Sequence, residues 1–305
     1  MNSALLAGVV TGAIMSGTSL LYATLGELVG ERAGIVNLGI EGIMLVGAAS
    51  GFAATAVTGS PSIGVVTAML AGAAVNQIFA YLVVTRRANQ LATGLSLMFF
   101  GFGLSALIGG PFVGALITGL PRLAIPGLDP QSAAARLLSY DALVYLALPT
   151  ALVIWWLVFR TRWGLHLRAV GESPAAAYAA GLQPGRLQYQ ALIFAGALGG
   201  IAGAHMSVAL TLTWAEGMTG GRGFIAIALV IFAKWNPLWA VAGAFLFGAA
   251  EGLQLQLQAA GSDISPFVMN MTPYLLTLAV LVVWGLRGRA ATAPAALGRT
   301  FTGVE

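Results

Sequence analysis

The stretch Gly164–Gly181, which reads GLHLRAVGESPAAAYAAG, is a polar island in an otherwise apolar chain. Within it, Ser173 is a good helix N-cap, and Pro174 suits the first helical position because the N–H that proline lacks would have no partner there. The alanines that follow favour a helix, and Gly181 stands where a left-handed C-terminal cap is wanted. The stretch therefore predicts a short, self-capped helix of about two turns. Because long apolar segments flank it, we expect this helix to lie outside a lipid bilayer and to contact a soluble partner.

The composition excludes an ordinary soluble domain. Hydrophobic residues make up 58% of the chain and charged residues only 8%, and the mean hydropathy is +0.89. The 41 glycines fit closely packed membrane helices, and the absence of cysteine excludes disulfides and thiolate metal sites. We therefore expect an all-α polytopic membrane protein.

Apolar runs of roughly 18 to 25 residues predict about nine transmembrane helices. Their ranges are 4–25, 34–58, 62–84, 91–109, 141–159, 187–212, 223–233, 237–258 and 268–286. When these spans alternate across the membrane, eleven of the 14 Lys and Arg residues fall on one side, which the positive-inside rule makes the cytoplasm. The eleven are Arg32, Arg86, Arg87, Arg160, Arg162, Arg168, Arg186, Lys234, Arg287, Arg289 and Arg299, and the other three are Arg122, Arg136 and Arg222. The basic residues thus indicate membrane orientation, with the N-terminus external and the C-terminus cytoplasmic, and not nucleic-acid binding.

The order of spans predicts two halves of opposite topology within one transmembrane domain, 1–286. We expect a first repeat at 1–110, a linking span at 141–159, a cytoplasmic segment at 160–186, a second repeat at 187–286 and a cytoplasmic tail at 287–305. A Gly/Arg echo between Gly30–Gly34 and Gly220–Gly223 supports the repeat. Inverted repeats are typical of transporters, whose solute path lies at the repeat interface. The proline-rich connection 110–140 either caps the helix ends or offers a docking surface, and we expect the tail from Ala290 to be disordered.

Two motifs resemble one known family. Gly30–Gly42, GERAGIVNLGIEG, resembles a signature of the inner-membrane permeases of ATP-binding-cassette (ABC) importers for branched-chain amino acids, monosaccharides and nucleosides, and looks most like the nucleoside subgroup. Thr161–Gly181 resembles the cytoplasmic segment with which such permeases dock on their ATPase, and Gly223–Ala228 fits the family too. The resemblance therefore covers nearly the whole chain.

The resemblance implies a permease subunit in the bacterial inner membrane that passes a small polar solute, most closely a nucleoside. The solute would arrive from an external binding protein. The implied partners are an ATPase subunit, which would carry the ATP and Mg, and a second permease subunit in a heterodimer, while this chain would carry no cofactor. The residues expected to couple to the ATPase are Gly171, Glu172, Ser173, Pro174, Ala177 and Gly181.

Polar residues inside the predicted spans are candidates for the solute path, because polar groups are costly at membrane depth. Asn37 and Glu41 are four residues apart and would share one helix face, so they either line the path or hold a local turn, for example through a pair of Glu41 with Arg32. Glu251 and Gln254 share a face of the eighth span, where Gln258 follows, and either meet the solute or bind neighbouring helices and interfacial water.

Other polar and aromatic side chains in the predicted spans also allow both a functional and a structural interpretation. Phe99, Phe100 and Trp214 could stack on a nucleobase or simply anchor the fold. Asn76 and Gln77 are expected to bond neighbouring helices, and His205 is expected to be a packing residue and, as the alternative, a proton relay.

No enzyme chemistry is predicted. The sequence has two histidines, no cysteine, no phosphate-binding loop and no metal-ligand cluster, so an ATP-driven function needs a separate ATPase chain. The alternatives are an ion-coupled secondary transporter, for which Glu41 and Glu251 are the main candidate acids, and an ABC permease for a sugar or a branched-chain amino acid. A secondary transporter has no need of the capped surface helix, which favours the importer.

Overall fold

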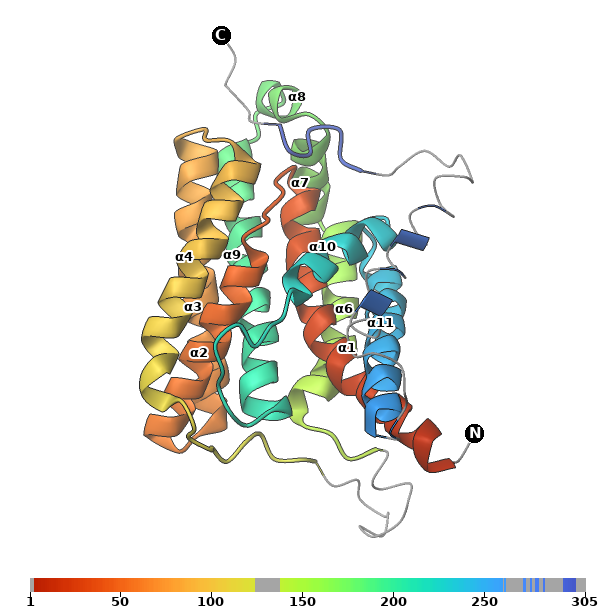
Figure 1. Cartoon of the computed structure of the whole chain (residues 1–305). Helices are drawn as coiled ribbons and strands as arrows, with labels where there is room; N and C mark the ends of the chain where they lie inside the picture. Colours follow the sequence, from red (N-terminus) through yellow and green to blue (C-terminus); the bar gives the residue numbers. More distant parts are fainter. Residues whose placement is uncertain are drawn as a thin grey trace.

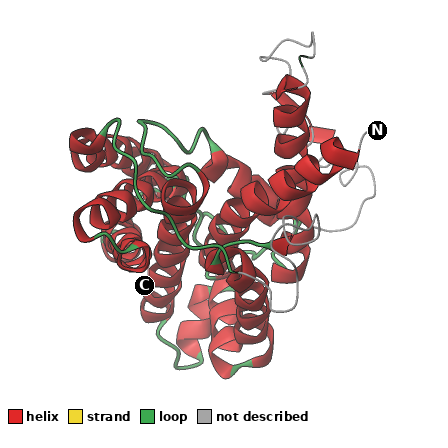
Figure 2. Cartoon of the chain, turned by 90° about the horizontal axis from the view of Figure 1, so that it is seen from below, coloured by secondary structure: helices red, strands yellow, loops and turns green. Residues whose placement is uncertain are grey.

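The computed structural model describes residues 3–123, 138–259, 261, 271, 272, 275, 278, 279, 282 and 293–299. In this part of the chain the elements are helices joined by loops (Figure 2). Seven helices are long and apolar enough to cross a membrane. They are α1 (Ser3–Arg32), α2 (Ile40–Thr58), α3 (Pro61–Ala80), α4 (Gln90–Gly109), α6 (Ala142–Arg160), α9 (Pro184–Ala204) and α11 (Pro237–Ala259). Shorter elements are η1 (Tyr81–Thr85), η2 (Gly110–Phe112), α7 (Arg162–Glu172), α8 (Pro174–Ala179), η3 (His205–Leu210) and α10 (Arg222–Phe232).

The count of about nine transmembrane helices is not confirmed. The predicted span 223–233 is α10, whose 11 residues rise only about 16 Å, roughly half of a bilayer core. The predicted span 268–286 lies largely outside the described residues. The fold is therefore an all-helical membrane bundle with seven full-length candidates and one half-length helix.

Two predicted boundaries in the first half are wrong for a physical reason. α1 continues to Arg32, past the predicted end at residue 25, because the polar residues of its last turn find partners inside the protein. Trp235 Nε1 donates to Glu31 Oε2 at 2.5 Å, and the Arg32 guanidinium donates to the Trp235 carbonyl at 2.8 Å. α2 begins at Ile40 and not at residue 34, since residues 33–39 form a turn.

The bundle has two ends (Figure 1). We call one of them the α7–α8 end; it also holds the C-terminal end of α1, the start of α4 and of α9, and residues 233–236 and 293–299. The opposite end holds residues 110–123, 138–141 and 205–217, which hydrogen-bond to one another through their backbones, as in Leu120 N–H to Val208 O at 3.1 Å. Arg222, which was predicted to lie in a connection, begins α10 inside the bundle.

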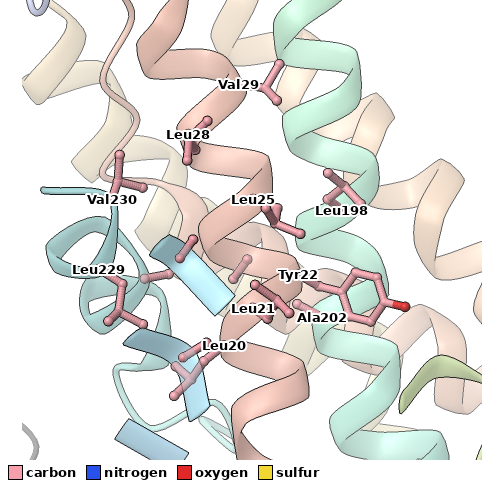
Figure 3. Close-up of a cluster of buried hydrophobic side chains, with 14 of the residues drawn as sticks. Leu20, Leu21, Tyr22, Leu25, Leu28, Val29, Leu198, Ala202, Leu229 and Val230 are labelled. Carbon is pink, nitrogen blue, oxygen red and sulfur yellow. The ribbon is translucent and has the colours of Figure 1, made fainter. Parts of the chain in front are cut away.

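Packing centres on α1 and α9. α1 packs against α11, α9 and α10, while α9 also packs against α3 and α2. Apolar side chains of α1, among them Leu21, Leu25 and Leu28, face Leu198 and Ala202 of α9 and Leu229 of α10 (Figure 3). The core is thus built between α1, α9 and α10.

Glycine permits the closest helix crossings. A methyl group built on Gly200 of α9 would overlap the Ala68 carbonyl of α3. At the α2 crossing, a methyl on Gly47 would lie 2.5 Å from the Gly200 carbonyl oxygen. Small residues let membrane helices meet backbone to backbone in this way.

The tail contradicts the prediction of disorder where the structure describes it. Residues 293–299 pack against α7, with Ala296 buried and its N–H donating to the Gly171 carbonyl at 2.9 Å. The amino-acid composition of the tail could not reveal this order, because the contacts are made by backbone groups, which every residue type carries.

Candidate functional site

The start of α10 is closed by a carboxylate from the other half of the chain. Gly221 N–H donates to Glu41 Oε1 at 2.7 Å, and Gly223 N–H donates to Glu41 Oε2 at 2.6 Å. The Thr219 hydroxyl also donates to Oε1, at 2.6 Å. The first N–H groups of a helix lack partners and carry the positive end of its dipole, so a buried carboxylate is a fitting cap.

The sequence around α10 is built for this cap. Gly221 has φ +85°, which favours glycine, and a methyl on Gly223 would lie 2.6 Å from the Glu41 backbone. Glu41 itself stands in the first turn of α2 and is 2% exposed. A carboxylate on α2 therefore closes the N-terminus of α10, and the predicted pair of Glu41 with Arg32 is wrong, because Arg32 binds the Trp235 carbonyl.

Asn37 lies in the turn before α2, so it does not share a helix face with Glu41. Its N–H donates to Glu27 Oε1 of α1 at 2.8 Å, and its Nδ2 donates to Asn76 Oδ1 of α3 at 2.8 Å. Asn76 Nδ2 in turn donates to the Leu192 carbonyl of α9 at 2.7 Å. Asn37 thus fixes the turn against three helices, and the expected interhelical role of Asn76 is confirmed. For Gln77, the structure gives Nε2 no partner among the described residues.

Glu251 reaches the same helix start from α11. Its Oε2 lies 2.8 Å from Arg222 Nη2, the two side chains being 14% and 22% exposed. The structure therefore brings Glu41 and Glu251 to the first residues of α10, whereas Asn37 binds elsewhere and Gln254 is partly exposed on α11. Sequence reasoning missed Arg222 as a site residue because it placed this residue on the outer surface.

The three candidate aromatic residues do not form a stacking site. Phe99 and Phe100 project from the outer face of α4, 67% and 49% exposed. Trp214 is buried against Gly109, where any β-carbon would overlap its indole ring. The fold-anchoring reading therefore holds for Trp214, and Phe99 remains a candidate only for contact with something outside this chain.

His205 is a buried packing residue. Its Nδ1 lies 2.7 Å from Ser19 Oγ, and its Nε2 lies 3.6 Å from Asp141 Oδ2. Burial raises the pKa of Asp141, but attraction to the nearby His205 ring and the N–H groups of the α6 start bring it below its ordinary value. Ser19 and His205 are fully buried, so the trio has no room for a substrate and instead ties α1 and η3 to the start of α6.

α8 is the capped helix that the sequence predicts. Ser173 Oγ accepts from Ala176 N–H at 3.2 Å, Gly181 has φ +84°, and Leu182 N–H closes the end on the Ala177 carbonyl at 3.0 Å. Ala177, however, faces the protein and is 3% exposed, whereas Tyr178 is 55% exposed. A partner at this helix would therefore meet Tyr178 and not the Ala177 side chain.

A cavity of about 300 Å³ lies beside α8 at the α7–α8 end. Its lining residues include two exposed cations, Arg87 and Arg299. The rest of the lining is Ile35, Val83, Val84, Gln90, Tyr178, Gln183, Pro184, Gly185 and Gln188. The exposed side of α8 thus continues into a hollow with a positive rim.

The tail and Gln90 connect α7 to the turn before α2. Ala296 binds Gly171 at the end of α7, and Gly298 N–H donates to the Gly34 carbonyl at 3.2 Å. Gln90 accepts from Val36 N–H at 2.9 Å and donates to the Arg299 carbonyl at 3.3 Å. A methyl on Gly171 would overlap the Arg32 carbonyl, so α7 ends directly on α1.

No group of three or more His, Asp or Glu side chains that could hold a metal ion occurs within the described residues.

Comparison with known proteins identifies one family. Residues 8–284 match the family described as "Branched-chain amino acid transport system / permease component".

Relatives are similar over almost their full length. The "Putative glucose ABC transporter permease protein TsgC13" of Haloferax volcanii is 38% identical, over 90% of this chain and 91% of the relative. The guanosine ABC transporter permease protein NupQ of Bacillus subtilis is 31% identical, over 95% of each chain. The nucleoside ABC transporter permease protein NupC of Lactococcus lactis is 30% identical, over 90% and 92%. The chain therefore belongs to the branched-chain amino acid transport system permease family and is an ABC transporter permease subunit, not itself an enzyme.

Proposed function

We propose that this permease subunit imports a nucleoside, driven by an ATPase that docks on α8. The observation that carries the proposal is α8 itself, a helix capped at both ends that stands exposed beyond the membrane-length helices. Its exposed tyrosine, Tyr178, is available for contact with a soluble partner. Family membership favours this ATP-driven reading over ion-coupled transport.

The docking surface would consist of the exposed side of α8 and the cavity beside it. Arg87 and Arg299 give this surface a positive rim, which suits an acidic segment of the ATPase. Of the residues expected to couple, Ser173, Pro174 and Gly181 shape α8, while Gly171 and Glu172 join it to α1 and the tail. Motion of the docked ATPase would thereby reach the turn before α2.

The basic residues support a cytoplasmic α7–α8 end in a bacterial inner membrane. Nine of them lie at that end in the described part of the chain, and Arg122 lies at the opposite one. The nine are Arg32, Arg86, Arg87, Arg160, Arg162, Arg168, Arg186, Lys234 and Arg299. The positive-inside rule then makes the N-terminus external, the C-terminus cytoplasmic, and the opposite end the place where an external binding protein delivers the solute.

Helix pairing supports the inverted repeat. The first helix of each half packs on the third helix of the other, α1 on α11 and α9 on α3. The second helix of each half is interrupted at its start, α2 by residues 33–39 and α10 by residues 211–221. Interrupted helices that meet inside the bundle are typical of transporter solute sites, so we place the path beside Asn37, Glu41, Glu251 and Gln254.

The solute class rests on the relatives. NupQ and NupC are named for guanosine and nucleosides, and TsgC13, which has the higher identity, makes a sugar the second candidate. NupP, a second guanosine permease protein of Bacillus subtilis, is 25% identical and supports a heterodimer of two permeases. Phe99, exposed on α4, would then face either that second subunit or the solute.

The test compares Tyr178→Asp with the control Asn89→Asp, which adds the same charge at another exposed position and keeps an N-cap residue. We expect Tyr178→Asp to lose the ATPase during purification and to abolish guanosine uptake, while the control retains both. Uptake of labelled guanosine and labelled glucose by the wild type decides the solute. ATPase retention and wild-type uptake in Tyr178→Asp would refute the docking proposal, and glucose uptake without guanosine uptake would replace the solute.

A further inference from the structure

The segment 205–217 follows α9 at the end opposite α7–α8 and leads toward α10 (Figure 1). It combines three features that are rare or cost free energy. His205–Leu210 form the π-helix η3, a rare helix type that is frequent at functional sites. Leu212 has φ +57°, a left-handed conformation that bulky residues seldom adopt. The buried indole Nε1 of Trp214 finds no acceptor in the described part of the chain. Such features concentrate in segments that switch between two states.

Trp214 fills the space between α2 and the end of α4. Its side chain is 3% exposed and packs with Ala49 and Phe52 of α2. A methyl group on Gly109 of α4 would lie 2.2 Å from the indole ring, so the ring lies directly on the α4 backbone. The neighbouring Ala215, in contrast, is exposed. Trp214 thus enters the bundle from a segment whose next residue lies at the surface.

The segment connects the loop after α4 to the start of α10. On one side, Ile117 N–H of that loop donates to the Leu212 carbonyl at 3.4 Å, which is a long hydrogen bond. On the other side, Thr219 follows Trp214 by five residues and donates its hydroxyl to Glu41 Oε1 at 2.6 Å. Outward movement of Trp214 would therefore pull on the residues beside which we place the solute path.

We propose that Trp214 closes the solute path at the end opposite α7–α8, and that segment 211–217 withdraws it when the permease opens. Withdrawal gives the indole N–H a partner in water or in the solute and lets Leu212 leave the left-handed region, so the open state regains what the closed state costs. A tryptophan that served packing alone would gain nothing from a donor without an acceptor. The proposal rests on the proposed path between the two halves and on the proposed external position of this end.

The test uses the absence of cysteine from the chain. Ala49→Cys places a single thiol beside Trp214, at a position that is fully buried. Intact cells with the complete transporter receive a membrane-impermeant methanethiosulfonate, with and without guanosine. We expect the thiol to react roughly tenfold faster during measured guanosine uptake, because a minor open state is populated to about 10% or less beforehand. Ala151→Cys on α6, equally buried, is the control and should stay unreactive in both conditions.

A second measurement, on the purified complex, depends neither on the solute nor on the orientation. Trp214→Ala should make the thiol of Ala49→Cys react without solute or ATP, at least as fast as it reacts during uptake in cells. Phe52→Ala, which removes a ring of the same cluster but leaves Trp214 in place, should keep the reaction slow.

Two outcomes would overturn the proposal. One is a thiol at position 49 that stays unreactive during measured uptake, and the other is equal reactivity in the Trp214→Ala and Phe52→Ala variants. Absence of guanosine uptake together with a reactive Trp214→Ala variant would refute the proposed solute and still support closure by Trp214.

Discussion

Glu41 joins the two halves of the permease through three charge-assisted hydrogen bonds to the loop and first turn of α10. Its carboxylate is buried, and these donors offset the cost of removing it from water. Of the donors, Thr219 and Gly223 are buried and have no solvent to replace Glu41. The stability of α10 therefore depends on a side chain that stands 178 residues earlier than Thr219.

Glu41→Ala should lower the free energy of unfolding by roughly 2–4 kcal/mol, since it leaves buried N–H groups without an acceptor. Glu41→Gln retains one acceptor oxygen and should lose less. Thermal unfolding of the purified permease in detergent measures both. Glu216→Ala, which removes an exposed acid, is the control, and a loss of the same size there would show that Glu41 has no special role.

Asp141 gives the opposite end a pH-dependent contact. A carboxyl group whose pKa is lower in the folded chain stabilises the fold at pH above its ordinary value of 3.8, and this stability is lost as the pH falls through the folded value. Asp141→Asn keeps an oxygen to cap α6 but removes the charge that faces His205. We expect it to cost about 1 kcal/mol near pH 7, and the difference from the wild type should shrink only as the pH falls below 3.8 and through the lowered pKa of the folded chain. A difference that persists unchanged in acid would contradict the assignment.

Elements differ in how far their sequence determines them. α8 was predictable because Ser173, Pro174 and Gly181 act on their own neighbours. α10 was not, since residues 223–233 have the hydropathy of a complete span and only the distant Glu41 marks the place where the helix begins. Likewise, Ser19, Asp141 and His205 are far apart in the sequence, and no local sequence pattern predicts that they are in contact.

The tail segment 293–299 connects α7 to the turn before α2 through backbone hydrogen bonds. Ala296→Pro removes the N–H that binds the Gly171 carbonyl and should loosen both ends of this connection. We expect amide hydrogen exchange in residues 33–36 and 169–173 to accelerate roughly fivefold to tenfold, as the loss of one hydrogen bond of about 1 kcal/mol implies.

Arg299→Ala is the matched control, because it keeps the backbone carbonyl that Gln90 binds. Its exchange rates should stay close to those of the wild type. Unchanged exchange in Ala296→Pro would mean that α7 and the turn are held by α1 alone.

For the whole molecule, the helix bundle alone does not determine which of its two ends faces the cytoplasm. A cysteine at Ser132, in the connection 110–140, would suit a labelling test, but Ser132 lies outside the described residues. We therefore choose Thr58 and Ala179, which are exposed at opposite ends of the bundle. The chain has no cysteine, and Thr58→Cys and Ala179→Cys therefore give single labels. In intact cells an impermeant maleimide should react with the first variant only, and with the second once the cells are opened. The reverse pattern would invert the topology.

The backbone contacts at Gly47 and Gly200 set the mutational tolerance of this protein. Where side chains interdigitate, a larger residue can often be accommodated by the repacking of its neighbours. At a glycine crossing there is no side chain to move, so even alanine must push whole helices apart. Adaptation to a new solute is therefore confined to positions away from the α2–α9–α3 crossings, and these crossings should be the first places where random mutagenesis finds no viable substitution.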